Sequence, residues 1–113
     1  MILKIDGEIN RYYVQSLCMV FFPGSTFGEN EMPSNGVPEV YVSVKTNDDE
    51  SVIASVSIKL NDKVSSADST VSADEQTVIS SKASVAVGRA MFSAGKSLLG
   101  HTPPWGILTV PRT

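Results

Sequence analysis

Two runs of alternating residues, at 40–45 and 52–60, constrain the fold of this chain more than any other feature. Every second residue in both runs is apolar, and most residues between them are Ser, Lys or Tyr. Successive side chains of a strand point to opposite faces, so the pattern predicts two strands. The intervening TNDDE, residues 46–50, predicts a hairpin turn. We expect an antiparallel pair with one face on a core and the other toward water or a neighbouring domain.

The N-terminal part of the chain predicts a strand followed by a helix. Residues 1–6 alternate in hydropathy and end at a glycine, which is typical of a short strand. Asn10 is the expected N-cap of the helix, and Pro23-Gly24 stops it. Bulky residues recur between them at helical spacing: Tyr13, Leu17, Val20 and Phe21, with Tyr12 and Phe22 alongside. We expect these aromatic residues to lie in the core rather than to form a ligand cage.

The C-terminal half predicts an exposed connection and a second helix. Residues 61–74 are rich in Ser and Asp, which favours an exposed, mobile segment. Ser72 and Glu75 have the spacing of a capping box, so a helix is expected to begin near them. Gly100 supplies the C-cap, and two prolines prevent continuation. The apolar residues at helical spacing are Ile79, Ala83, Ala86, Val87, Ala90, Met91, Ala94 and Leu98.

The expected order of elements is therefore strand, helix, strand, strand, helix. Two helices on one face of a small, mainly antiparallel sheet form a two-layer α+β sandwich, which buries both helical stripes and both apolar strand faces. A length of 113 residues suits one such domain. We assign residues 1–102 to it.

Charge and apolar content argue against two classes of protein. The nine Lys and Arg residues are spread along a chain of net charge −3, so nucleic acid is not expected as the leading partner. The longest purely apolar run, residues 19–22, is far shorter than the ~20 residues that span a bilayer. The chain also opens without the pattern of a signal peptide. We expect no membrane partner and a cytoplasmic location.

Few residues are candidates for chemistry. Cys18 is the only cysteine, so it can form neither an internal disulfide nor a Cys-rich metal site, and we expect a buried, inert thiol. His101 is the only histidine and lies at an expected helix end, which makes it a weak binding candidate. The acidic residues 48–50 predict a charged hairpin tip rather than a cation site. These residues alone indicate no catalytic, cofactor-binding or metal centre.

Two short stretches carry a specific resemblance to a known family. Phe21-Phe22-Pro23-Gly24 and Pro104-Trp105-Gly106-Ile107-Leu108-Thr109 resemble motifs of the oxygen-independent coproporphyrinogen III oxidase-like proteins, the coproporphyrinogen dehydrogenase branch of the radical-SAM enzymes. The expected order of elements is similar to that of the family's N-terminal region. After the threonine the family continues Gly-Val-Arg-Pro, whereas this chain reads Val110-Pro111-Arg112-Thr113.

The resemblance implies an accessory role in haem biosynthesis. The parent enzyme oxidatively decarboxylates coproporphyrinogen III, using a [4Fe–4S] cluster on a CxxxCxxC motif and S-adenosylmethionine, both in a C-terminal catalytic domain. This chain lacks those motifs, so we expect no cofactor in it, a non-catalytic N-terminal domain, and residues 103–113 as a truncated connector toward the absent catalytic domain. The candidate interdomain contacts are Phe21, Phe22, Pro23, Gly24, Pro104, Trp105, Gly106 and Leu108.

A second hypothesis is a free-standing binding or protein-interaction module. It would use the exposed hairpin face around Tyr41 and Ser43, or the C-terminal tail, which could also join two copies in a homodimer. An independent enzyme is disfavoured, because the sequence shows no recognisable acid–base pair or activated nucleophile.

Overall fold

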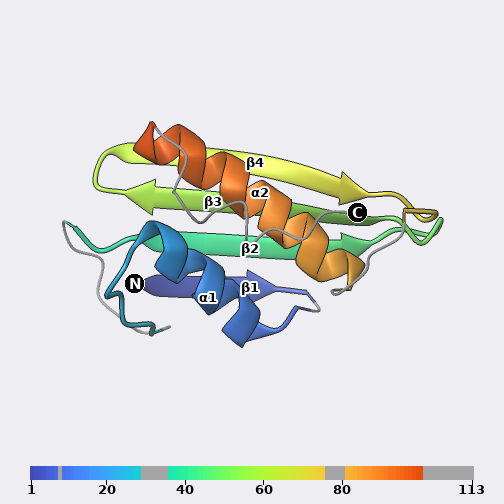
Figure 1. The fold of residues 1–113 in the computed structure, drawn as a ribbon, viewed down its shortest axis with the longest axis horizontal. Helices are drawn as coiled ribbons and strands as arrows, with labels where there is room; N and C mark the ends of the chain where they lie inside the picture. The colour runs from blue at the N-terminus through green and yellow to red at the C-terminus, as the bar shows by residue number, and fades with distance from the viewer. Residues whose placement is uncertain (8, 29–35, 76–80, 101–113) are drawn as a thin grey trace.

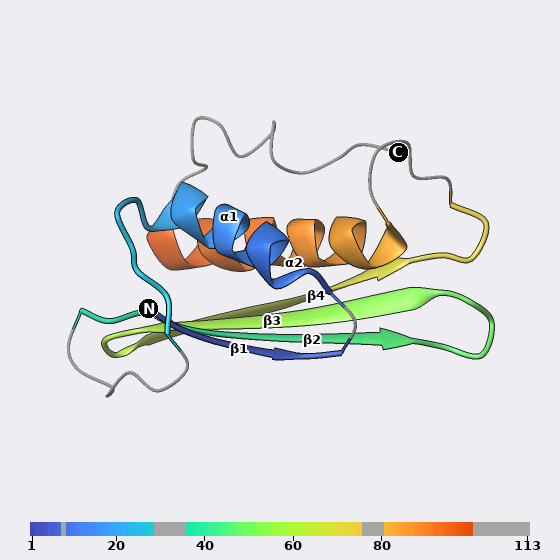
Figure 2. The same ribbon diagram turned by 90° about the horizontal axis from the view of Figure 1, so that it is seen from below.

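The described part of the chain forms a four-stranded sheet with two helices on one face (Figure 1). The computed structural model describes residues 1–7, 9–28, 36–75 and 81–100. The elements in chain order are β1 (Ile2–Asp6), α1 (Arg11–Phe21), β2 (Glu39–Thr46), β3 (Val52–Leu60), β4 (Lys63–Val71) and α2 (Lys82–Leu99). Figure 2 shows both helices on the same side of the sheet. The expected α+β class with two layers is confirmed.

The sheet is mixed rather than purely antiparallel. Its strand order is β1-β2-β3-β4, with β1 parallel to β2 and the other neighbours antiparallel. Parallel neighbours need a crossover connection, and the chain between β1 and β2 contains α1. The predicted hairpin is confirmed, because Thr46 pairs with Val52 and the turn lies between them.

The prediction of an exposed connection over residues 61–74 is wrong, because most of it forms β4. A two-residue turn joins β3 to β4, and Asn61 adopts the positive φ of 55° that such tight turns require. The half-buried positions of β4 are small residues, Ser65, Ala67 and Ser69, and α2 packs on this strand. A helix can pack closely on small side chains. β4 therefore pairs with β3 and is covered by α2, although it has few apolar residues.

The predicted start of the second helix is also wrong. The N-cap of α2 is Ser81, whose side chain accepts a hydrogen bond from the backbone N–H of Ser84. Ser72 and Glu75 instead form a turn after β4, where the Glu75 N–H donates to the Ser72 carbonyl at 3.1 Å. Ile79 lies outside the described residues. The predicted C-cap is confirmed, since Gly100 adopts the left-handed conformation with φ of 77°.

In α1 the predicted N-cap is confirmed, because the Asn10 side chain accepts from the N–H groups of Tyr12 and Tyr13. The buried stripe is Val14, Leu17, Cys18 and Phe21. Placing Tyr12 in the core is wrong, since it is 78% exposed. Two residues correspond to about 200° around a helix, so Tyr12 lies away from the side that Val14 buries. Tyr13 and Phe22 are partly buried against the core.

The core fills the space between the helices and the inner face of the sheet. Its fully buried large side chains come from the four strands and both helices: Leu3, Val14, Cys18, Val40, Val56, Ile58, Val71, Val85, Val87 and Met91. The helices meet where Gly95 faces Phe21, and a Cβ on Gly95 would lie 2.4 Å from the Phe21 Cε1 atom. Neither helix in the described part of the chain is long and apolar enough to cross a membrane.

Candidate functional site

The side of the sheet that faces away from the helices carries the candidate site. Strand pairing aligns its side chains in two adjacent central rows, which we call the open face: Lys4, Tyr41, Ser57 and Ser66 in one row, and Asp6, Ser43, Ser55 and Asp68 in the other. Each strand contributes one residue to each row. All eight side chains are exposed or half-buried.

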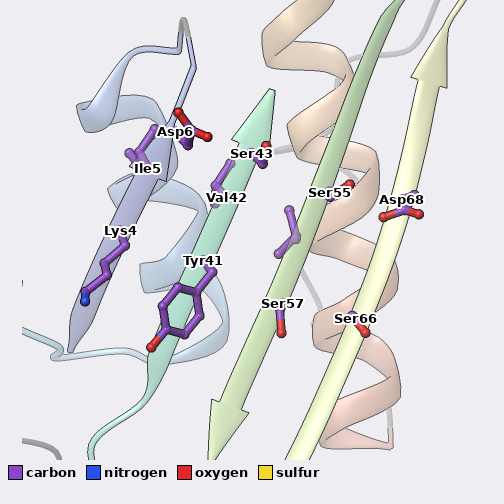
Figure 3. A pocket seen from close by; sticks show the side chains of 11 residues that line it. Lys4, Ile5, Asp6, Tyr41, Val42, Ser43, Ser55, Ser57, Ser66 and Asp68 are labelled. Atoms are coloured by element: carbon purple, nitrogen blue, oxygen red, sulfur yellow. The ribbon is translucent and has the colours of Figure 1, made fainter. Parts of the chain in front are cut away.

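A shallow hollow of about 320 Å³ lies in the middle of the open face. The eight side chains of the two rows line it, and Ile5, Val42 and Val56 complete its lining (Figure 3). The hollow follows from side-chain size, because four serines lie beside the much larger Tyr41, which is 40% exposed. The site therefore offers a ring, several hydroxyls and a depression on one surface.

Electrostatically the open face is mixed: Lys4 and Asp6 lie on β1 at one edge of the sheet, and the second carboxylate, Asp68, lies on β4 at the other edge. An ion pair joins Lys59 to Glu39 in the neighbouring row, with 3.9 Å between the Lys59 Nζ and Glu39 Oε2 atoms. Hydroxyls both donate and accept hydrogen bonds, so the serines can satisfy polar groups of either kind. The arrangement suits hydrogen bonding to a partner surface more than recognition of one charged group.

Residues 48–50 form the charged tip of the hairpin, as predicted, and hydrogen bonds within the turn hold it. The Asp49 carboxylate accepts from the Ser51 hydroxyl at 2.6 Å and from the Ser51 N–H at 3.0 Å. These bonds, the hydroxyl first, lower the pKa of Asp49 below its usual range. The Asn47 side chain also donates to the Ser51 hydroxyl at 3.0 Å, so this acidic segment builds its own turn.

A scan against protein-family models, a search of curated proteins and a search of solved structures found no match to this chain. Within the described residues, no group of three or more His, Cys, Asp or Glu could hold a metal ion.

An iron–sulfur cluster does not fit the residues of this chain. Such clusters are held mainly by several Cys thiolates, and Cys18 is the only cysteine. The confirmed burial of Cys18 in the core raises the pKa of its thiol to about 12, which disfavours the thiolate that ligation needs.

The candidate interdomain residues Phe21, Phe22, Pro23 and Gly24 lie at the end of α1, in the helix layer. Phe21 is buried, and the Phe22 N–H donates to the Cys18 carbonyl at 2.9 Å to end the helix. Pro23 and Gly24 are exposed. The structure thus places this motif on the opposite side of the sheet from the open face (Figure 2). Pro104, Trp105, Gly106, Leu108 and His101 lie outside the described residues.

Sequence reasoning found the centre of the open face but missed its margins. Tyr41 and Ser43 were expected on an exposed hairpin face, and the structure brings them together with Ser55 and Ser57. The contributions of β1 and β4 were missed. The available signal for β1 was the alternation of apolar and charged residues in 3–6, whereas residues 64–71 of β4 show no such alternation.

Proposed function

We propose that this domain is a protein-interaction module whose binding surface is the open face of its sheet. The observation that carries this proposal is the hollow of about 320 Å³, lined by serine hydroxyls beside Tyr41. A protein partner can fill it with a side chain while the hydroxyls pair with polar groups at the rim. Tyrosine is enriched at interfaces because its ring is apolar and its tip forms hydrogen bonds.

We further propose that the module is the non-catalytic N-terminal domain of an oxygen-independent coproporphyrinogen III oxidase-like radical-SAM enzyme, acting in the cytoplasm in haem biosynthesis. The support is the resemblance of residues 21–24 and 104–109 to that family's motifs, together with a similar order of elements. The [4Fe–4S] cluster, S-adenosylmethionine and the oxidative decarboxylation belong to the catalytic domain. That domain is the partner this module accompanies in the parent protein.

The charge of the open face favours docking over substrate binding. The parent enzyme decarboxylates its substrate, which is therefore a carboxylic acid, and Arg or Lys are the usual partners of carboxylates. The hollow has one such residue, Lys4, against the carboxylates of Asp6 and Asp68. A carboxylate ligand would meet more negative than positive charge there. A protein surface with mixed polar groups is the better complement.

The binding surface is tested by placing bulk in the hollow. Ser57→Arg is expected to weaken association about tenfold, whether the partner is the separately expressed catalytic domain or a second copy. Ser93→Arg is the matched control, because Ser93 is exposed on α2, away from the open face. Calorimetric titration and sedimentation measure the affinities, and circular dichroism checks folding. Equal affinities for the two variants would contradict the open face as the binding surface.

The family proposal is tested by the reading frame that encodes this chain. A CxxxCxxC motif in the same frame, C-terminal to Thr113, is the expected result. A stop codon directly after Thr113, with no such motif encoded nearby, would overturn the assignment while leaving the open face as a candidate interaction surface.

A further inference from the structure

We infer that the occupant of the open face is a second copy of this chain, packed sheet to sheet about a two-fold axis that crosses the strands. Because it names the partner of that same face, this assignment rests on the proposed interaction function. It follows from the order of charges and side-chain sizes on the face.

The strand register fixes which side chains surround the two central rows. One flanking row contains Ile2, which is buried, with Glu39, Lys59 and Val64, and the other contains Lys45, Ile53 and Thr70. The face therefore consists of four parallel rows that cross the strands. In a two-fold interface each contact between two different residues occurs twice, so the arrangement of these rows decides which axis is possible.

Consider first a two-fold axis that lies in the interface, crosses the strands and runs midway between the two central rows. About this axis each strand lies over the same strand of the partner, and the two run in opposite directions. Lys4 then lies opposite the partner's Asp6, and Asp6 lies opposite the partner's Lys4. Opposite charges meet at both places, which favours this pairing.

About that axis, the flanking rows also bring opposite charges together. Lys45 lies opposite the partner's Glu39. Within each copy, Glu39 is already paired with Lys59 of the same chain at 3.9 Å. On β4, Asp68 lies opposite the partner's Ser66, a hydroxyl that can donate to the carboxylate. No like charges oppose one another among these side chains of the described strands.

An axis that runs along the strands gives a different result. It would place β1 over the partner's β4, and each row over the same row of the partner. Asp6 would then lie opposite the partner's Asp68 at two places. Carboxylates facing one another in an interface cost free energy. The same axis would also place Glu39 opposite the partner's Lys59, a favourable contact, but the axis that crosses the strands brings no carboxylates together, so the charge order favours it.

Side-chain size agrees with the same axis. It places Tyr41 opposite the partner's Ser43, a small residue that lines the hollow. Each copy then contributes one ring and one depression, and the two contacts are equivalent by symmetry. On β3, Ser55 lies opposite the partner's Ser57, and Ser57 lies opposite the partner's Ser55. The facing residues at the centre of β3 are therefore small, and they leave room for the two tyrosine rings.

The size of the face predicts a weak dimer. Four strands about 4.8 Å apart and about eight residues long, at about 3.3 Å per residue, give a face of about 19 Å by 26 Å. Two such faces total about 1,000 Å², at the lower end of specific interfaces. A dissociation constant in the micromolar range is therefore expected, with weaker association at high salt because exposed charges contribute.

Charge reversal on the full 113-residue chain tests this assignment by sedimentation velocity over a concentration series. Lys4→Asp alone and Asp6→Lys alone should each weaken the dimer at least about tenfold, because both symmetric contacts become repulsive. The double variant should regain an affinity within about threefold of the original, since it restores opposite charges. Lys63→Asp, at an exposed position in the inward-facing register of β4, is the control and should change little.

Two results would overturn the assignment: a chain that stays monomeric up to about 0.5 mM, or single variants whose loss the double variant does not recover. Lys4 and Asp6 are also neighbours on one face of β1, so urea unfolding of each single variant separates a lost dimer contact from a destabilised fold. If the chain is monomeric but Ser57→Arg still weakens binding to the catalytic domain, only the identity of the partner is wrong. If Ser57→Arg affects no association, the proposed interaction function falls as well.

Discussion

At the scale of single residues, Gly95 allows the two helices to approach one another. An added Cβ would lie 2.4 to 2.7 Å from ring atoms of Phe21, which is itself buried against α2. Gly95→Ala should therefore destabilise the fold by about 1–3 kcal/mol through overpacking, although Ala is favoured over Gly in helices by about 1 kcal/mol. Urea unfolding measures the difference.

Ser93→Ala, on the exposed side of the same helix, is the control and should change stability little. Combining Gly95→Ala with Phe21→Leu should cost less than the sum of the two single changes, because the smaller side chain makes room. A Gly95→Ala variant as stable as Ser93→Ala would show that the helices can separate without cost.

Cys18 is expected to be chemically inert in the folded protein. Burial raises its pKa to about 12, so almost no thiolate exists near neutral pH, and the thiol is inaccessible to reagents. An aromatic disulfide reagent should label it only as fast as the protein unfolds, and fully in denaturant. Ser97→Cys, on the exposed side of α2, should label at once. Fast labelling of Cys18 under native conditions would be evidence against this packing.

At the scale of elements, the start of α2 gives a direct test between two serines. Ser81→Ala removes the hydroxyl that caps the helix and should cost about 1 kcal/mol. Ser72→Ala removes a side chain from the turn after β4, where only its carbonyl accepts a bond from Glu75, and should cost much less. Thermal or urea unfolding of the two variants measures this. The reverse order would place the cap at Ser72.

The hairpin tip should make stability depend on acid. Ser51 donates to Asp49 and lowers its folded-state pKa, so this contribution is fully present above the unfolded pKa of about 3.9 and is lost as pH falls through the lower folded value. Ser51→Ala should shift the Asp49 titration upward, as followed by carboxyl NMR signals. Ser43→Ala, elsewhere on β2, should leave it unchanged. An unshifted Asp49 would mean that the hydroxyl bond is not formed.

The hairpin, β1, both ends of α1 and the C-terminal end of α2 illustrate what local sequence can predict. Their signals are periodicity, an Asn10 cap and a Gly100 stop, all of which act within a few neighbouring residues. β4 lacked such a signal because its half-buried positions are small residues, and α2 decides their burial from a distant part of the chain. Ser72 and Glu75 have the right spacing for a cap, but Glu75 instead bonds Arg89 at 2.6 Å.

The candidate site divides in the same way. The alternation of Tyr41 and Ser43 with valines identified an exposed hairpin face from sequence alone. The rows that complete the face need the register of β1 on β2 and of β4 on β3, and register depends on contacts between distant segments. The charge order that selects a dimer axis could therefore be seen only in the structure.

At the scale of the whole molecule, one core joins every element. Each strand and helix contributes at least one fully buried side chain to it: Leu3, Val14, Val40, Ile58, Val71 and Val85. An element that detaches would expose part of this shared core, so we expect a single cooperative unfolding transition. Far-ultraviolet circular dichroism and the near-ultraviolet tyrosine signal should give the same midpoint in urea. Separated midpoints would show that the helices or a strand unfold independently.

The one-sided placement of the helices has a consequence for how such a domain can change over evolutionary time. Along each strand, one set of alternate residues packs in the core, and most residues of the other set, with Ile2 as an exception, are not buried. Substitutions at Ser43, Ser55 or Ser66 can therefore alter which partner is recognised at little cost in folding. The same separation makes the open face a practical place for library selection, because variants can be screened for new specificity on an unchanged scaffold.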